Sequence, residues 1–121
     1  MANTTATFDL PALRRGIEQR DADALLGLYA DDAEVVEVSK TTPPSTPAIL
    51  RGKDAIRAHL ADVCGREMTH SLERVVVGER NASFTEACRY PDGTAVLCTA
   101  MLDLDAEGRI TRQIGVTAWD E

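Results

Sequence analysis

The second half of this chain reads almost entirely as β-strand, and this feature constrains the fold more than any other. Alternating apolar residues between turn signals predict strands at about 68–78, 81–90, 94–104 and 109–118. The tripeptide "PDG" at 91–93 and the segment "DAEG" at 105–108 are typical of tight turns. Successive strands should therefore pair antiparallel in a meander.

Helical periodicity and capping residues predict three helices in the first half. Apolar residues recur at helical spacing behind Asp9, a residue type that caps helix N-termini, and predict a helix over about 10–19. A second, short helix follows Asp21 and ends at Asp31-Asp32. The third helix covers about 53–63, with Gly65 placed to stop it.

A strand and a long loop separate the second and third helices. The strand is expected over about 33–39. The segment "TTPPSTPAILRG" follows, and its three prolines predict an irregular loop. The element order predicts an α+β fold, with three N-terminal helices on one face of a curved, mostly antiparallel sheet. The 121 residues are expected to form a single domain over 1–121.

Composition argues against several classes of partner. The formal net charge is −7 and no cluster of lysine and arginine occurs, which disfavours nucleic acid and anionic membranes. No apolar run approaches the roughly 18 residues of a membrane span. The first residues, "MANTTATFDLP", lack the order of a signal peptide, so we expect a cytoplasmic protein.

Cysteines and histidines give no sequence signal for a metal or a disulfide framework. The three cysteines show no C-x-x-C spacing, and we expect free thiols. His59 and His70 lie eleven residues apart with no second ligand at helical spacing, so neither a metal nor a cofactor is predicted.

Three motifs resemble one known superfamily. "LYADDAEV", "GKDAIRAHL" and "DAEGRI" occur in the order and spacing of the NTF2-like superfamily, and are similar to its SnoaL-like and ketosteroid-isomerase-like branch. The resemblance covers about residues 10–119. It implies a cone-shaped, cystatin-like fold with a pocket between the helices and the concave face of the sheet. Because this fold hosts many activities, it specifies the architecture more than the function.

The resemblance also implies a catalytic carboxylate. Ketosteroid isomerases carry a general-base Asp in the first strand, and aligning "YADDAEVVE" with their motif places Glu37 at that position. Their two carbonyl-polarising residues correspond to Leu13 and Ala100, which donate no hydrogen bond. A conventional steroid isomerase is therefore not expected. His59, on the third helix, would be the replacement donor if it faces inward; a solvated position is the alternative.

The hairpin register adds further residues to the predicted pocket. A turn over 91–93 places Glu86 opposite Cys98 and Cys88 opposite Val96, on one face with Phe84 and Ala100. The resemblance makes this the concave face, so Glu86 is a second pocket carboxylate, or else an ion-pair partner of an arginine at the rim. The remaining predicted wall residues are Gln113, Thr117 and Trp119, the last with a terminal packing role as the alternative. His70 alternates with Leu72 and is expected at the surface, with a position facing the same cavity as the alternative.

The opposite face of strand 94–104 carries Leu97, Thr99 and Met101. Apolar residues on the outer face of a sheet need a cover. The resemblance implies that this face pairs two copies, so a homodimer is predicted.

Three functions remain open on the sequence. The first is an isomerase- or polyketide-cyclase-like enzyme that transfers a proton on a hydrophobic carbonyl compound, with Glu37 as base. The second is a non-catalytic binder of a small apolar molecule. The third is a dimeric scaffold with a vestigial cavity.

Overall fold

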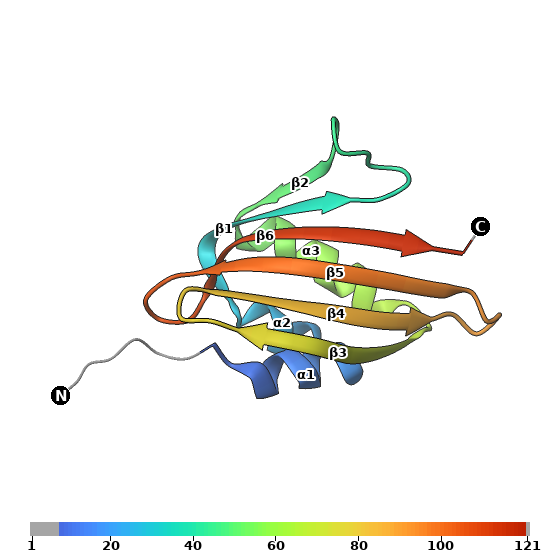
Figure 1. Ribbon diagram of the computed structural model, residues 1–121, viewed down its shortest axis with the longest axis horizontal. Helices are drawn as coiled ribbons and strands as arrows, with labels where there is room; N and C mark the ends of the chain where they lie inside the picture. The colour runs from blue at the N-terminus through green and yellow to red at the C-terminus, as the bar shows by residue number, and fades with distance from the viewer. Residues whose placement is uncertain (1–7, 121) are drawn as a thin grey trace.

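The computed structural model describes residues 8–120, in which three helices pack on a six-stranded sheet (Figure 1). The elements are α1 (Leu10–Glu18), α2 (Ala22–Leu26), β1 (Tyr29–Val38), β2 (Ala48–Arg51), α3 (Gly52–Gly65), β3 (Thr69–Val77), β4 (Asn81–Arg89), β5 (Ala95–Leu104) and β6 (Ile110–Trp119). The strand order is β2-β1-β6-β5-β4-β3, and β1–β6 is the one parallel pair among these strands. The predicted α+β class is confirmed.

The helices begin where their capping residues predict. The Asp9 carboxylate accepts a hydrogen bond from the Ala12 amide at 3.0 Å, and the Asp21 carboxylate accepts one from the Ala24 amide at 3.1 Å. Each bond satisfies an amide that the first turn leaves without a backbone partner. In Figure 1, α3 lies behind the sheet and α1 lies beside β3, so the three helices cover one face.

The prediction for the start of β1 was wrong. The strand begins at Tyr29 and includes Asp31 and Asp32, which were expected to end the preceding helix. Tyr29 pairs with Ile110 of β6, and the register then shifts before Glu34. Such an irregularity accommodates extra residues within a strand, and both aspartates are exposed there.

The prediction of an irregular loop over the whole segment after β1 was also wrong. Its last part forms β2, which pairs antiparallel with β1, with Ile49 opposite Val36. All three prolines precede Ala48, so no strand amide is missing. β2 is an edge strand and needs only one partner.

The core lies between the helices and the concave face of the sheet. Its most deeply buried large side chains are Ile56 of α3, Leu102 of β5 and Ile110 of β6. A small second cluster joins Met68, Cys88 and Val96 near the far end of the strands. Within residues 8–120, no helix is long and apolar enough to cross a membrane.

Candidate functional site

A cavity of about 460 Å³ opens between α1, α3 and the concave face of the sheet. Its wall is mainly apolar, with a small number of polar side chains. The wall includes all ten residues that the sequence places in the site: Leu13, Glu37, His59, Phe84, Glu86, Cys88, Ala100, Gln113, Thr117 and Trp119. Their roles in binding and catalysis stay predictions.

Glu37 lies on β1 directly beside Gly115 of β6. A Cβ atom added at Gly115 would lie 2.6 Å from Glu37 Oε2, so the absence of a side chain there makes room for the carboxylate. Burial raises the pKa of Glu37, and the charge of Glu86 raises it further. The carboxylate is therefore a stronger base than an exposed glutamate.

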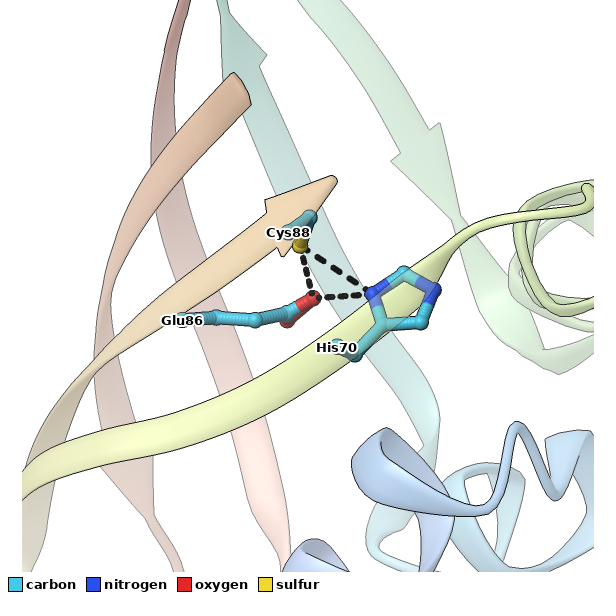
Figure 2. Close-up of side chains that lie close together, drawn as sticks. All are labelled: His70, Glu86 and Cys88. Carbon is cyan, nitrogen blue, oxygen red and sulfur yellow. Dashed lines mark hydrogen bonds and ion pairs between the residues drawn. The ribbon is translucent and has the colours of Figure 1, made fainter. Parts of the chain in front are cut away.

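Glu86, His70 and Cys88 form a compact cluster on β3 and β4 (Figure 2). His70 Nδ1 lies 3.1 Å from Glu86 Oε1 and 3.1 Å from Cys88 Sγ, and the sulfur lies 3.2 Å from the same oxygen. A hydrogen bond to Cys98, burial and the charge of Glu86 raise the pKa of the Cys88 thiol. The partner of Glu86 is thus a histidine, and not the arginine considered as an alternative.

The prediction of a surface position for His70 was wrong, since its side chain is only 5% exposed. His70 precedes the bulge at Arg74 and shares one face of β3 with Leu72, which is buried in the core. On that face His70 pairs with Cys88 on the cavity side.

Tyr29 is a cavity residue that the sequence analysis missed, because it was assigned to a helix. Its hydroxyl donates a hydrogen bond to Gln113 Oε1 at 2.6 Å. Burial raises its pKa, and the charges of Glu37 and Glu86 add to this effect, so the phenol stays protonated. The signal available in the sequence was chemical: a buried tyrosine needs a partner for its hydroxyl.

His59 is half-buried on α3 and lines the cavity. Burial lowers its pKa, and Arg66 lowers it further against a smaller opposing effect of Asp62. Of the two positions that the sequence left open, His59 takes the one that faces the cavity. A lowered pKa favours the neutral imidazole, which offers one ring N–H as a donor.

The remaining predicted wall residues carry no charge and contribute to the shape of the cavity. Leu13 of α1 and Ala100 of β5 are buried and apolar, and Phe84 pairs with Ala100 across the hairpin, as the predicted register requires. Cys98 contacts the Thr117 hydroxyl, with 3.4 Å between sulfur and oxygen. Trp119, the last residue of β6, is 39% exposed.

The cavity thus combines the basic carboxylate of Glu37, the Glu86 carboxylate beside His70, and several neutral donors inside a mainly apolar wall. Tyr29 fixes the Gln113 side chain by its oxygen. Among residues 8–120, no hydrogen bond reaches Gln113 Nε2. This amide nitrogen is available to a ligand in the cavity. Such a set of groups can hold a ligand oxygen and move a proton beside it.

Similar solved structures share this architecture. A protein of unknown function from Mesorhizobium loti, described as NTF2-like, is 22% identical, with 90% of this chain and 87% of that one covered and a TM-score of 0.73. A protein from Kribbella flavida provisionally assigned as a ketosteroid isomerase is 14% identical, with coverage of 92% and 74% and a TM-score of 0.72. The epoxide hydrolase/cyclase-like enzyme SalBIII is 17% identical, with coverage of 90% and 87% and a TM-score of 0.69.

These similarities establish an NTF2-like fold, as the sequence motifs predicted. No curated protein sequence matches the chain. The family model of the SnoaL-like domain matches residues 12–113, which include most of α1, all of β4 and β5, and the three sequence motifs. The chain therefore belongs to the family of SnoaL-like domains.

Proposed function

We propose that this protein is an isomerase- or cyclase-like enzyme that transfers a proton on a small, apolar carbonyl compound, with Glu37 as the base. The observation that carries the proposal is the position of the Glu37 carboxylate, which lies over Gly115 in a mainly apolar cavity. A base is most effective when its pKa approaches the working pH, and burial moves the pKa of Glu37 in that direction.

The proposed step begins with a ligand whose carbonyl oxygen accepts a hydrogen bond from Gln113 Nε2. Glu37 removes the proton from the carbon beside the carbonyl, and the electron pair of that C–H bond forms the enolate. The protonated Glu37 then returns the proton to the same carbon or to a conjugated one. Donors aimed at the developing oxyanion contribute strongly to such reactions. Tyr29 acts as a positioning residue, because it orients the Gln113 amide.

The SnoaL-like family and the cavity support the class of ligand and not the reaction. SalBIII is described in connection with pyran ring formation in the polyether salinomycin. The SnoaL-like domain and the cavity indicate a small-molecule-binding protein. A binder without turnover remains the competing function, and the test below separates the two.

The test is deuterium exchange in heavy water, followed by proton NMR on an apolar cyclic ketone. We expect the wild-type protein to accelerate loss of the signal from the carbon next to the carbonyl. Glu37→Gln should reduce this rate by about 10²–10⁴-fold, the usual contribution of a general base.

Glu34→Gln is the matched control, because Glu34 is on the same strand and pairs with Arg51 and Arg112 instead of lining the cavity. It should retain the exchange rate. Saturable ketone binding with exchange at the rate of free solution would contradict the enzymatic proposal and favour the binder.

A further inference from the structure

We propose that His70, Glu86 and Cys88 form a binding site for a zinc-class divalent metal ion. Each offers one ligand atom, and the three atoms lie within 3.1 to 3.2 Å of one another (Figure 2). They combine an imidazole nitrogen, a carboxylate oxygen and a sulfur, the three types of ligand that zinc takes in proteins. The proposal does not depend on the role of Glu37.

The number of hydrogens in the cluster favours a cation over a hydrogen-bond network. An ionised Glu86 has none to donate, the Cys88 thiol has one, and the Nδ1 atom of His70 has at most one when the ring is neutral. At most two hydrogens are therefore available for the three close contacts, so one contact has no hydrogen between its two atoms. A single ion between the three atoms accounts for all of them at once.

The geometry also argues against a nucleophilic cysteine activated by a histidine. In such a triad, one ring nitrogen faces the nucleophile and the other faces the carboxylate. Here both contacts are made by Nδ1, so the ring cannot pass a proton between Cys88 and Glu86 through its two nitrogens. Three atoms that converge on one point suit coordination instead.

The cluster needs only a small adjustment to accept the ion. With zinc–ligand distances of about 2.0–2.3 Å, tetrahedral coordination separates the ligand atoms by roughly 3.3–3.6 Å. The contacts would open by about 0.2–0.5 Å, within reach of side-chain rotation. The bound ion would deprotonate the Cys88 thiol, since metal ligation requires the thiolate.

The backbone holds the three ligands on rigid elements. His70 and Cys88 are directly paired on β3 and β4, and Glu86 is two residues from Cys88 on the same face. His70 shares this face with Leu72, which is buried in the core. All three ligands also line the cavity, so a fourth coordination position would face it, as in zinc sites that bind a water or a substrate.

Cobalt(II) is the probe, because it replaces zinc and gives a charge-transfer band when a thiolate binds it. The full chain is treated with a chelator, freed of the chelator and titrated with cobalt chloride. We expect one cobalt per chain, a thiolate-to-cobalt band in the near ultraviolet, and loss of the band when zinc chloride is added. Cys88→Ser should remove the band, and His70→Ala should weaken cobalt binding by at least about 100-fold.

The matched controls are Cys64→Ser and His59→Ala, which alter one cysteine and one histidine of the cavity wall outside the cluster. Both should bind cobalt as the wild type does. Glu37→Gln should also bind it fully, so loss of exchange activity and loss of metal binding are separable results. Circular dichroism checks that each variant is folded.

Two results would overturn the proposal. One is a wild-type protein that gives no thiolate-to-cobalt band at an excess of cobalt, a result that needs no variant. The other is a folded Cys88→Ser variant that keeps the full band, because the thiolate would then lie elsewhere.

Discussion

The two faces of the same sheet reverse the usual distribution of residues. The concave face of β4–β6 encloses polar groups such as Glu86, Cys88 and Gln113 in an apolar cavity. The outer face exposes large apolar side chains, with Met101 63% exposed and Val116 49% exposed. Buried polar groups and exposed apolar patches both call for an explanation in a folded protein. We propose that something binds to each face, a small molecule inside and a protein surface outside.

The outer apolar residues form a continuous row across neighbouring strands. Met101 of β5 is paired with Ile114 of β6, which is paired with Val36 of β1 and, beyond it, Ile49 of β2. Leu97 and Val116 extend the patch along the strands. We propose that this surface pairs two copies of the chain. Substitutions on one face at a time show whether the properties of the other face change.

The largest effect is expected from Gly115→Ala, which changes the concave face by one methyl group. The new Cβ would overlap the position of Glu37 Oε2, so the carboxylate must turn away. Displacing a catalytic group by about 1 Å costs about 100-fold in rate, and we expect a loss of that size in the deuterium-exchange assay.

Gly27→Ala is the control for this substitution, because a Cβ there would meet its nearest atom at an ordinary 3.6 Å. It should leave the exchange rate unchanged. A Gly115→Ala protein with the wild-type rate would show that the position of Glu37 does not matter for turnover.

Met101→Glu should weaken dimerisation through the outer face and leave the cavity on the inner face unchanged. Light scattering at micromolar concentration should give about twice the chain mass of 13.1 kDa for the wild type. A charge placed in the apolar row should raise the dimer dissociation constant by about 10–100-fold, because it would be buried without a partner. The exchange rate per chain should change little.

Ala106→Glu adds the same charge at an exposed position in the turn between β5 and β6 and should remain dimeric. A wild-type protein that is monomeric at these concentrations would refute the proposed interface.

Tyr29→Phe should lower the stability of the folded protein, because it removes a hydrogen bond on the concave face of the sheet. It removes the donor to Gln113 Oε1 and leaves a partly buried carbonyl oxygen without its partner. We expect the free energy of unfolding in urea to fall by about 1–3 kcal/mol. Tyr90→Phe is the control, because its hydroxyl is exposed and contacts Arg66 at 3.5 Å. Equal stability losses in the two variants would contradict a special role for the Tyr29 bond.

The smallest effect is a pH-dependent change in stability from Glu37→Gln. Burial raises the pKa of Glu37 in the folded state, so the folded protein binds this proton more tightly than the unfolded chain does. That stabilisation is complete below the unfolded pKa and is lost as the pH rises through the folded pKa. The variant, which mimics the protonated form, should gain stability relative to wild type between pH 4 and pH 7. A relative loss over this range in urea unfolding would reverse the predicted sign.

Local signals were enough to predict the later half of the sheet and which side chains share a face, and the family resemblance identified that face as the cavity wall. The turn at 91–93 fixes the register of β4 and β5, and the structure confirms that Glu86 faces Cys98. Strand alternation then assigns every second side chain to the cavity. The alignment of Glu37 needed the family resemblance in addition.

The features that the sequence did not predict depend on contacts between distant segments. The bulge at Arg74, which has a φ of 30°, has no local marker in the sequence. Tyr29 joins a strand because β6, some eighty residues away, pairs with it. The cluster of His70, Glu86 and Cys88 could not be predicted for the same reason. His70 and Cys88 are 18 residues apart, and they meet only because β3 and β4 pair in this register.

The carboxyl pKa of Glu37, measured by carbon-detected NMR with Glu37→Gln to assign the signal, tests the central claim most directly. The proposed base lies in an apolar cavity beside a second carboxylate, so its pKa should lie clearly above the usual value of about 4.3 for glutamate. Its titration should coincide with the acidic limb of the exchange rate. A pKa at or below the usual value would mean a solvated or ion-paired group, and the role of Glu37 as the base would be contradicted.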